Sequence, residues 1–162
     1  MTPAARNRLL LLGAVWGLAL AVVPAIVMTD PYELTGFLVV ALLCAAASGV
    51  VGTLVAGGRV SRRASGRKAT RGAAALRGLG IGAVQGIVGG AFAALLFWTV
   101  MALTISGFTL RDPVELSVLM SPRIFLGSFF VALSAFAYTL VGGLVLGPLF
   151  GPLVERAASK EK

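Results

Sequence analysis

Four long stretches of the chain contain no Asp, Glu, Lys, Arg or His side chain, and they constrain the fold more than any other feature of the sequence. They cover residues 9–29, 34–58, 78–110 and 124–154, and each is between 21 and 33 residues long. About 20 helical residues cross a hydrocarbon core about 30 Å thick, so each stretch is long enough to span a bilayer once but not twice. Helices satisfy their own backbone hydrogen bonds in lipid, and no stretch alternates with the period of two that is typical of strands. We therefore predict an all-α integral membrane protein with four transmembrane helices in a single domain.

The composition agrees with this class of protein. Of the 162 residues, 58% are apolar and 12% are charged, whereas soluble domains have about 45–50% and about 25%. The single cysteine excludes a disulfide scaffold. A cleavable signal peptide is an alternative for the first stretch, because Arg6 and Arg8 precede the apolar run. The run continues as far as Met28, which favours a spanning helix.

The basic residues predict the orientation of the four helices. If the N-terminus is cytoplasmic, 12 of the 14 Lys and Arg residues lie on the cytoplasmic side, and only Arg111 and Arg123 lie outside. Basic residues concentrate in short cytoplasmic loops. We expect the plasma membrane of a prokaryote, both termini in the cytoplasm, and two helical hairpins over 9–58 and 78–154. A basic cytoplasmic loop over 59–77 joins the hairpins, and a cytoplasmic tail covers 155–162.

The expected basic loop holds seven positive charges, no acidic residue and no aromatic residue. We expect these side chains to fix the topology and to contact anionic lipid headgroups. Binding to nucleic acid is not expected, because no aromatic side chain is present to stack on bases. The seven residues are Arg59, Arg62, Arg63, Arg67, Lys68, Arg71 and Arg77.

Two turns that are expected outside have similar sequences. Asp-Pro-Tyr-Glu at 30–33 and Asp-Pro-Val-Glu at 112–115 lie 82 residues apart, and Trp16 and Trp98 have the same offset. One interpretation is a tandem duplication of a hairpin; the other is two independent helix N-caps. Ser121, before Pro122, predicts the start of the fourth helix in the same way. The outer carboxylates are capping groups in either case, and a funnel for cations is the alternative: Asp30, Glu33, Asp112 and Glu115.

The third stretch has a small residue at every fourth position: Gly78, Gly82, Gly86, Gly90 and Ala94. Such stripes let helix backbones approach closely, and a four-residue period favours a right-handed crossing. We predict that this stripe is a packing interface, either within the chain or between chains. A helix that lines a pore is the alternative.

The sequence lacks the usual equipment of catalysis. It has no histidine, no nucleophile or phosphate-binding motif, and no acidic or basic side chain in the four stretches to relay protons. Cys44 lies inside the second stretch and is predicted to be a packing residue. We therefore expect neither an enzyme nor a metal or other cofactor.

Only a few polar side chains lie within the expected spans. Gln85 lies beside the glycine stripe, where adhesion between helices is favoured over a transport site. The same role is expected for Thr99, Ser134, Tyr138 and Thr139. Trp16 and Trp98 fall in the middle of spans, which suggests packing in the bundle or against a partner.

Two functions are compatible with these sequence features. The preferred hypothesis is a non-catalytic small subunit of a larger membrane complex, of the transporter or respiratory type. The alternative is a small homo-oligomeric channel or facilitator, lined by the third helix near Gln85. The expected partners are membrane lipids, and either other membrane subunits or copies of the same chain.

Overall fold

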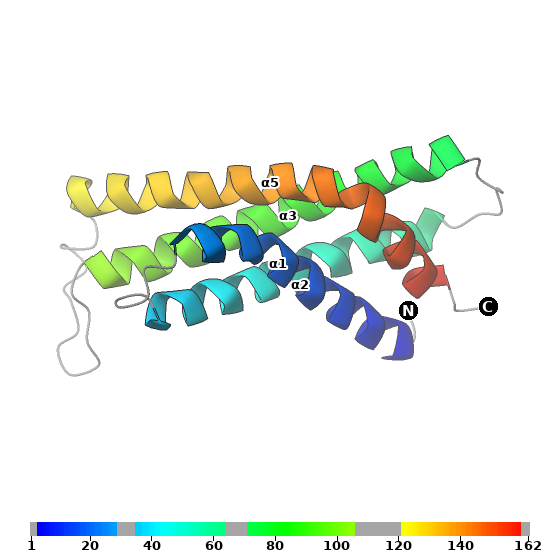
Figure 1. The fold of residues 1–162 in the computed structure, drawn as a ribbon, viewed down its shortest axis with the longest axis horizontal. Coiled ribbons are helices and arrows are strands. Elements are labelled where there is room, and N and C mark those ends of the chain that lie inside the picture. The colour runs from blue at the N-terminus through cyan, green and yellow to red at the C-terminus, as the bar shows by residue number, and fades with distance from the viewer. Residues whose placement is uncertain (1–2, 29–34, 64–70, 106–120, 160–162) are drawn as a thin grey trace.

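The computed structural model describes residues 3–28, 35–63, 71–105 and 121–159, and these segments form four long helices (Figure 1). The helices are α1 (Pro3–Met28), α2 (Thr35–Arg63), α3 (Arg71–Ile105) and α5 (Pro122–Ser159). Each of them is long and apolar enough to cross a membrane. The prediction of an all-helical protein with four membrane helices is confirmed.

The helix α5 begins where the sequence predicts. The Phe125 amide donates a hydrogen bond of 2.9 Å to the carbonyl of Ser121, which makes Ser121 the N-cap residue. Pro122 occupies the first helical position, where its missing N–H has no cost. The start of this helix is therefore set by local backbone chemistry.

The helices at the basic end are longer than the uncharged stretches, which corrects the prediction of a loop over 59–77. Helix α2 continues to Arg63 and α3 begins at Arg71. Arginine favours the helix, and helices of 29 and 35 residues are about 44 and 53 Å long, more than the hydrocarbon core needs. Their basic ends are therefore helical beyond the length that a hydrocarbon core requires. Five of the seven residues are helical, namely Arg59, Arg62, Arg63, Arg71 and Arg77, and the other two lie outside the described residues.

The bundle consists of two antiparallel pairs, α1 with α2 and α3 with α5, and α2 also packs against α3 (Figure 1). The first turn of α1 and the last turn of α5 lie at the same end of the bundle. The start of α1, the end of α2, the start of α3 and the end of α5 meet there. Arginines from all four helices therefore gather at this end, and Arg123, at the start of α5, lies at the opposite end.

The core lies between all four helices, near the basic end. Its largest member is Trp16, which is fully buried and stacks on Phe150 with ring centroids 5.0 Å apart. The remaining buried members are Leu9, Leu20, Ala56, Ile81, Val154 and Ala157. Only 17% to 33% of each apolar span is buried inside the molecule. The outer surface is therefore apolar, as contact with lipid requires.

Helix α5 bends in its last third, where the ribbon turns from orange to red (Figure 1). Pro148 and Pro152 lie inside this part of the helix. A proline within a helix removes a backbone hydrogen bond and clashes with the preceding turn, so it kinks the helix. The bend directs the last turns of α5 toward the beginning of α1.

Candidate functional site

The glycine stripe of α3 lies against α5 within the same chain. A Cβ atom built on Gly78 would lie 2.8 Å from the carbonyl oxygen of Gly147, and one built on Gly82 would overlap the Gly143 carbonyl. The contact is reciprocal, since a Cβ on Gly143 would lie 2.9 Å from the Cα of Gly86. The two backbones are therefore in direct contact, which only glycine permits. We call this contact the α3–α5 seam.

The outer part of the stripe contacts a side chain as well as backbone, since a Cβ on Gly90 would also lie 3.2 Å from the Phe136 carbonyl oxygen. A Cβ on Gly90 would meet the ring of Phe136 at 3.1 Å, and Ala94 is half-buried. An α-helix has 3.6 residues per turn, so positions four apart drift around its axis. The stripe therefore leaves the line of closest approach as it continues along α3.

Helices α1 and α2 form a second seam of the same kind. A Cβ on Gly13 would lie 2.7 Å from the Cα of Val50, and one on Gly49 would lie 2.6 Å from the Gly17 nitrogen. The four-residue spacing of Gly13 and Gly17 is the sequence feature that indicates this seam. Such spacings also arise by chance in a chain rich in small residues, so the spacing alone does not predict the contact.

Gln85 is fully buried where α3 packs on α2. A Cβ on Gly52 would lie 3.1 Å from Cγ of Gln85, and one on Gly89 would lie 3.3 Å from its Nε2. The absence of side chains at these two glycines therefore makes room for the amide. Neither Oε1 nor Nε2 has a hydrogen-bond partner among the described residues.

Two further helices carry a fully buried polar atom without a partner in the described part of the chain. These atoms are Nε1 of Trp16 on α1 and Oγ1 of Thr53 on α2. On α3, Nε1 of Trp98 is also buried without a partner among the described residues, although the Trp98 side chain as a whole is half-buried. Buried polar groups without partners cost about 1–3 kcal/mol each and are uncommon in native proteins. Trp16, Thr53 and Gln85 are the members of this set whose whole side chain is fully buried. They are therefore the candidate functional residues, because a bound polar group is one way to satisfy them.

Most of the membrane hydroxyl groups bond to their own helix, which corrects their expected role in adhesion between helices. Thr99, Ser134 and Thr139 each donate to the carbonyl four residues earlier, at 2.8 to 2.9 Å. Serine and threonine commonly form this bond inside helices. These three side chains therefore make no hydrogen bond that joins two of the described helices.

Tyr138 is different, because its hydroxyl donates a hydrogen bond of 2.7 Å from α5 to the Leu20 carbonyl of α1. In an uninterrupted helix that carbonyl accepts from the amide four residues later. This position is Pro24, which has no N–H. The tyrosine thus satisfies a carbonyl that the proline leaves free, and it ties the two helices together.

We expect Tyr138→Phe to lower the free energy of unfolding by about 1 kcal/mol, because it removes this donor and leaves the Leu20 carbonyl unsatisfied in an apolar environment. The measurement is unfolding in mixed micelles by titration with a denaturing detergent. Thr139→Val is the matched control, since its hydroxyl bonds only within α5. Equal stability of the two variants would show that the link between α1 and α5 contributes nothing.

The two tryptophans that align at an offset of 82 residues have different surroundings. Trp16 is fully buried, whereas Trp98 is half-buried and meets Phe125 edge-on at 5.9 Å. The duplication therefore stays a prediction.

The expected outer carboxylates, Asp30, Glu33, Asp112 and Glu115, lie outside the described residues. Within the described segments, no three potential metal ligands come together. Cys44 is buried with a free thiol, in a position that suits a packing residue.

Comparison of the chain with protein-family models, with curated proteins and with solved structures finds no match in any of the three. The class of the protein therefore follows from its own features. Four long apolar helices, backbone contacts through glycine and an apolar outer surface make it a four-helix integral membrane protein.

Proposed function

We propose that the chain is a non-catalytic small subunit that packs within a larger membrane complex, of the transporter or respiratory type, with both termini in the cytoplasm. One observation carries the proposal. The two faces of α3 that hold its small and polar residues pack against other helices of the same chain. The face with Gly82 lies against α5, and the face with Gln85 lies against α2. By its sequence, α3 is the helix best suited to line a path for a permeating solute. In the structure these faces of α3 are used for packing within the chain.

The charge distribution supports the proposed orientation. The arginines of the four described helix ends gather at one end of the bundle, and Arg123 lies at the other. The positive-inside rule places the arginine-rich end in the cytoplasm.

The outer surface supports membership of a complex. Helix α5 exposes a row of large side chains on one face, including Phe129 and Phe130, which are 46% and 63% exposed. The rings of Phe125 and Phe129 stack with centroids 6.3 Å apart. Aromatic side chains supply a large contact area with few rotatable bonds, and they are enriched where proteins meet.

The test is purification of the tagged protein from its native membranes in mild detergent, followed by mass measurement of the intact assembly. We expect at least one different membrane protein in stoichiometric amount. An unrelated membrane protein with the same tag, purified in parallel, is the control for adventitious capture. A particle that contains only this chain, alone or as a homo-oligomer, would overturn the proposal.

The alternative function is a homo-oligomeric channel or facilitator, and the unpartnered amide of Gln85 favours it. An amide with no partner among the described residues is available to a permeating polar solute or to water. In this alternative, α3 must move away from α2 to open a path beside Gly52 and Gly89.

Gln85→Leu distinguishes the two functions. If Gln85 only packs, the variant removes two unsatisfied atoms and we expect it to raise the free energy of unfolding by about 1 kcal/mol, with vesicle permeability unchanged. The measurements are unfolding in mixed micelles and solute entry into proteoliposomes at high protein loading. Ser134→Ala, on an exposed face of α5, is the control. A solute flux that is present in the native protein and lost in Gln85→Leu would establish the alternative.

A further inference from the structure

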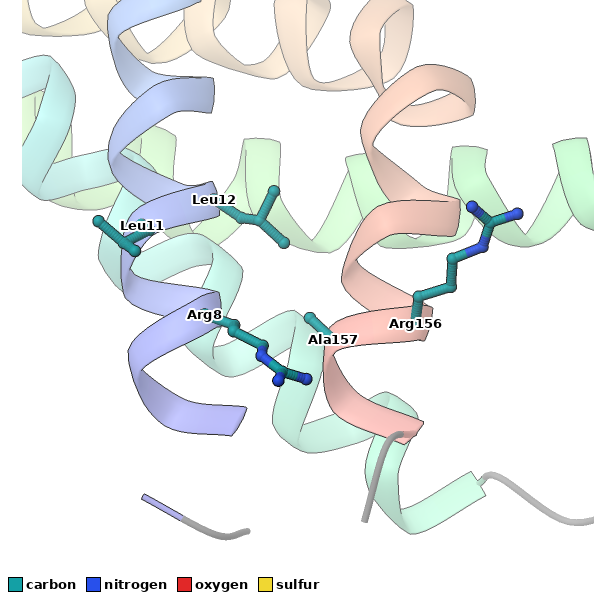
Figure 2. A pocket seen from close by; sticks show the side chains of 5 residues that line it. All are labelled: Arg8, Leu11, Leu12, Arg156 and Ala157. Carbon is teal, nitrogen blue, oxygen red and sulfur yellow. The ribbon is translucent and has the colours of Figure 1, made fainter. Parts of the chain in front are cut away.

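A groove lies between the first turns of α1 and the last turns of α5, at the basic end of the bundle (Figure 2). Its volume is about 340 Å³, within the range of about 300–1,000 Å³ that is usual for ligand sites. Five residues line it: Arg8, Leu11 and Leu12 from α1, and Arg156 and Ala157 from α5. The groove exists because the proline-containing bend of α5 brings its last turns toward α1.

The lining of the groove carries two positive charges and no negative charge. Arg8 and Arg156 are both exposed, and neither is ion-paired with another residue of the described helices. In Figure 2 the Arg8 side chain extends from α1 toward Ala157, whereas the guanidinium of Arg156 extends away from α1. Contact of both guanidinium groups with one ligand therefore requires a change of rotamer at Arg156, which its long side chain permits. Guanidinium groups bind phosphate oxygens with paired hydrogen bonds.

The remaining lining is apolar, and its two leucines lie farther from the basic end than Arg8 does. Leu11, which is 70% exposed, and Leu12 lie about one turn along α1 from Arg8, inside the uncharged stretch. The neighbouring residues Leu9 and Val154 are fully buried in the core, and Ala157 in the lining is nearly so. A ligand that fits this groove has an anionic group at the basic end of the bundle and an apolar part that extends toward the middle of the bundle.

We propose that this groove binds one anionic phospholipid, with its phosphate at Arg8 and Arg156 and the beginning of an acyl chain along Leu11 and Leu12. A free phosphate ion would use the two arginines but would leave the leucines exposed. A zwitterionic phospholipid would offer the same acyl chains and a phosphate, but its cationic amine group would lie beside the two arginines and oppose binding. Each basic residue near an anionic membrane surface contributes about 1 kcal/mol, so the two arginines give the site its preference for anionic lipid.

The experiment uses the purified full-length protein in mild detergent, titrated with phosphatidylglycerol or with phosphatidylcholine that has the same acyl chains. Native mass spectrometry counts the lipids bound to each molecule. We expect one tightly retained phosphatidylglycerol and no retained phosphatidylcholine. Arg8→Gln and Arg156→Gln each weaken the retention about fivefold. Leu11→Asn weakens it as well, while the charges stay in place.

Arg77→Gln is the matched control, because Arg77 is exposed at the same end of the bundle but lies on α3, outside the groove. We expect it to retain phosphatidylglycerol as the native protein does. An equal loss in Arg77→Gln and Arg8→Gln would show a diffuse attraction of the basic end and would overturn the proposal. Equal retention of the two lipids, or displacement of the lipid by millimolar inorganic phosphate, would also overturn it. All of these side chains are exposed, so the variants are expected to fold.

Discussion

Gly82→Leu should unfold the second helical pair, and Gly80→Leu, two residues away on the same helix, should not. The Cβ of the new side chain at position 82 would overlap the Gly143 carbonyl and lie 2.7 Å from the Cα of Gly147. Backbone atoms cannot rotate away, so α3 and α5 must separate along the seam. Overpacking of a side-chain core costs about 1–3 kcal/mol, and forced separation of two backbones should cost at least about 3 kcal/mol. At Gly80 an added Cβ meets nothing within 4 Å.

The measurement is the free energy of unfolding in mixed micelles, followed by circular dichroism, together with the yield of monodisperse protein. Gly86→Leu should fall between the two variants, since its Cβ would lie 3.0 Å from the Cα of Leu140. If Gly82→Leu and Gly80→Leu unfold at the same detergent fraction, the backbone contact between α3 and α5 does not hold the pair together.

Trp16→Ala should cost about 3–5 kcal/mol, the largest loss expected from shortening any one side chain in this protein. Trp16 is fully buried, and its ring stacks on Phe150, so its removal leaves a cavity between α1 and the bent part of α5. The cost arises mainly from lost packing contacts, because in a membrane the unfolded reference state is also surrounded by apolar groups.

Trp98→Ala is the natural comparison, since Trp98 is only half-buried and meets Phe125 at a ring edge. We expect it to lose less than half as much stability as Trp16→Ala, measured by the same unfolding titration. The remaining tryptophan reports the transition by fluorescence in each variant. Equal losses in the two variants would mean that the Trp16 ring does not anchor α1 to α5.

The sequence predicts the features of this fold that depend on local chemistry. Four apolar stretches of sufficient length predict four helices, and Ser121 followed by Pro122 predicts the start of α5. Where the helices end in the headgroup region is less predictable. Charged residues in the sequence predict where the hydrocarbon core ends, but they do not terminate a helix. Helix α2 therefore continues through Arg59 to Arg63.

Features that depend on two distant segments are not visible in the sequence. The stripe from Gly78 to Gly90 predicts a close contact, but its partner depends on how α5 crosses α3. Pro24 shows that the Leu20 carbonyl lacks its helical donor, yet nothing in the sequence indicates that Tyr138 supplies one. The groove at Arg8 and Arg156 likewise requires the bend of α5.

The two seams have a consequence for biosynthesis. Each seam joins helices that follow one another in the order of the described helices, α1 with α2 and α3 with α5. Helices α1 and α2 can therefore pack together while the ribosome is still translating the rest of the chain. Helices α3 and α5 can then pack together against the α1–α2 pair that has already formed. Contacts between neighbouring segments form quickly and leave little surface open to misassembly. A truncated chain that ends after α2 should accordingly insert and pack as a closed hairpin.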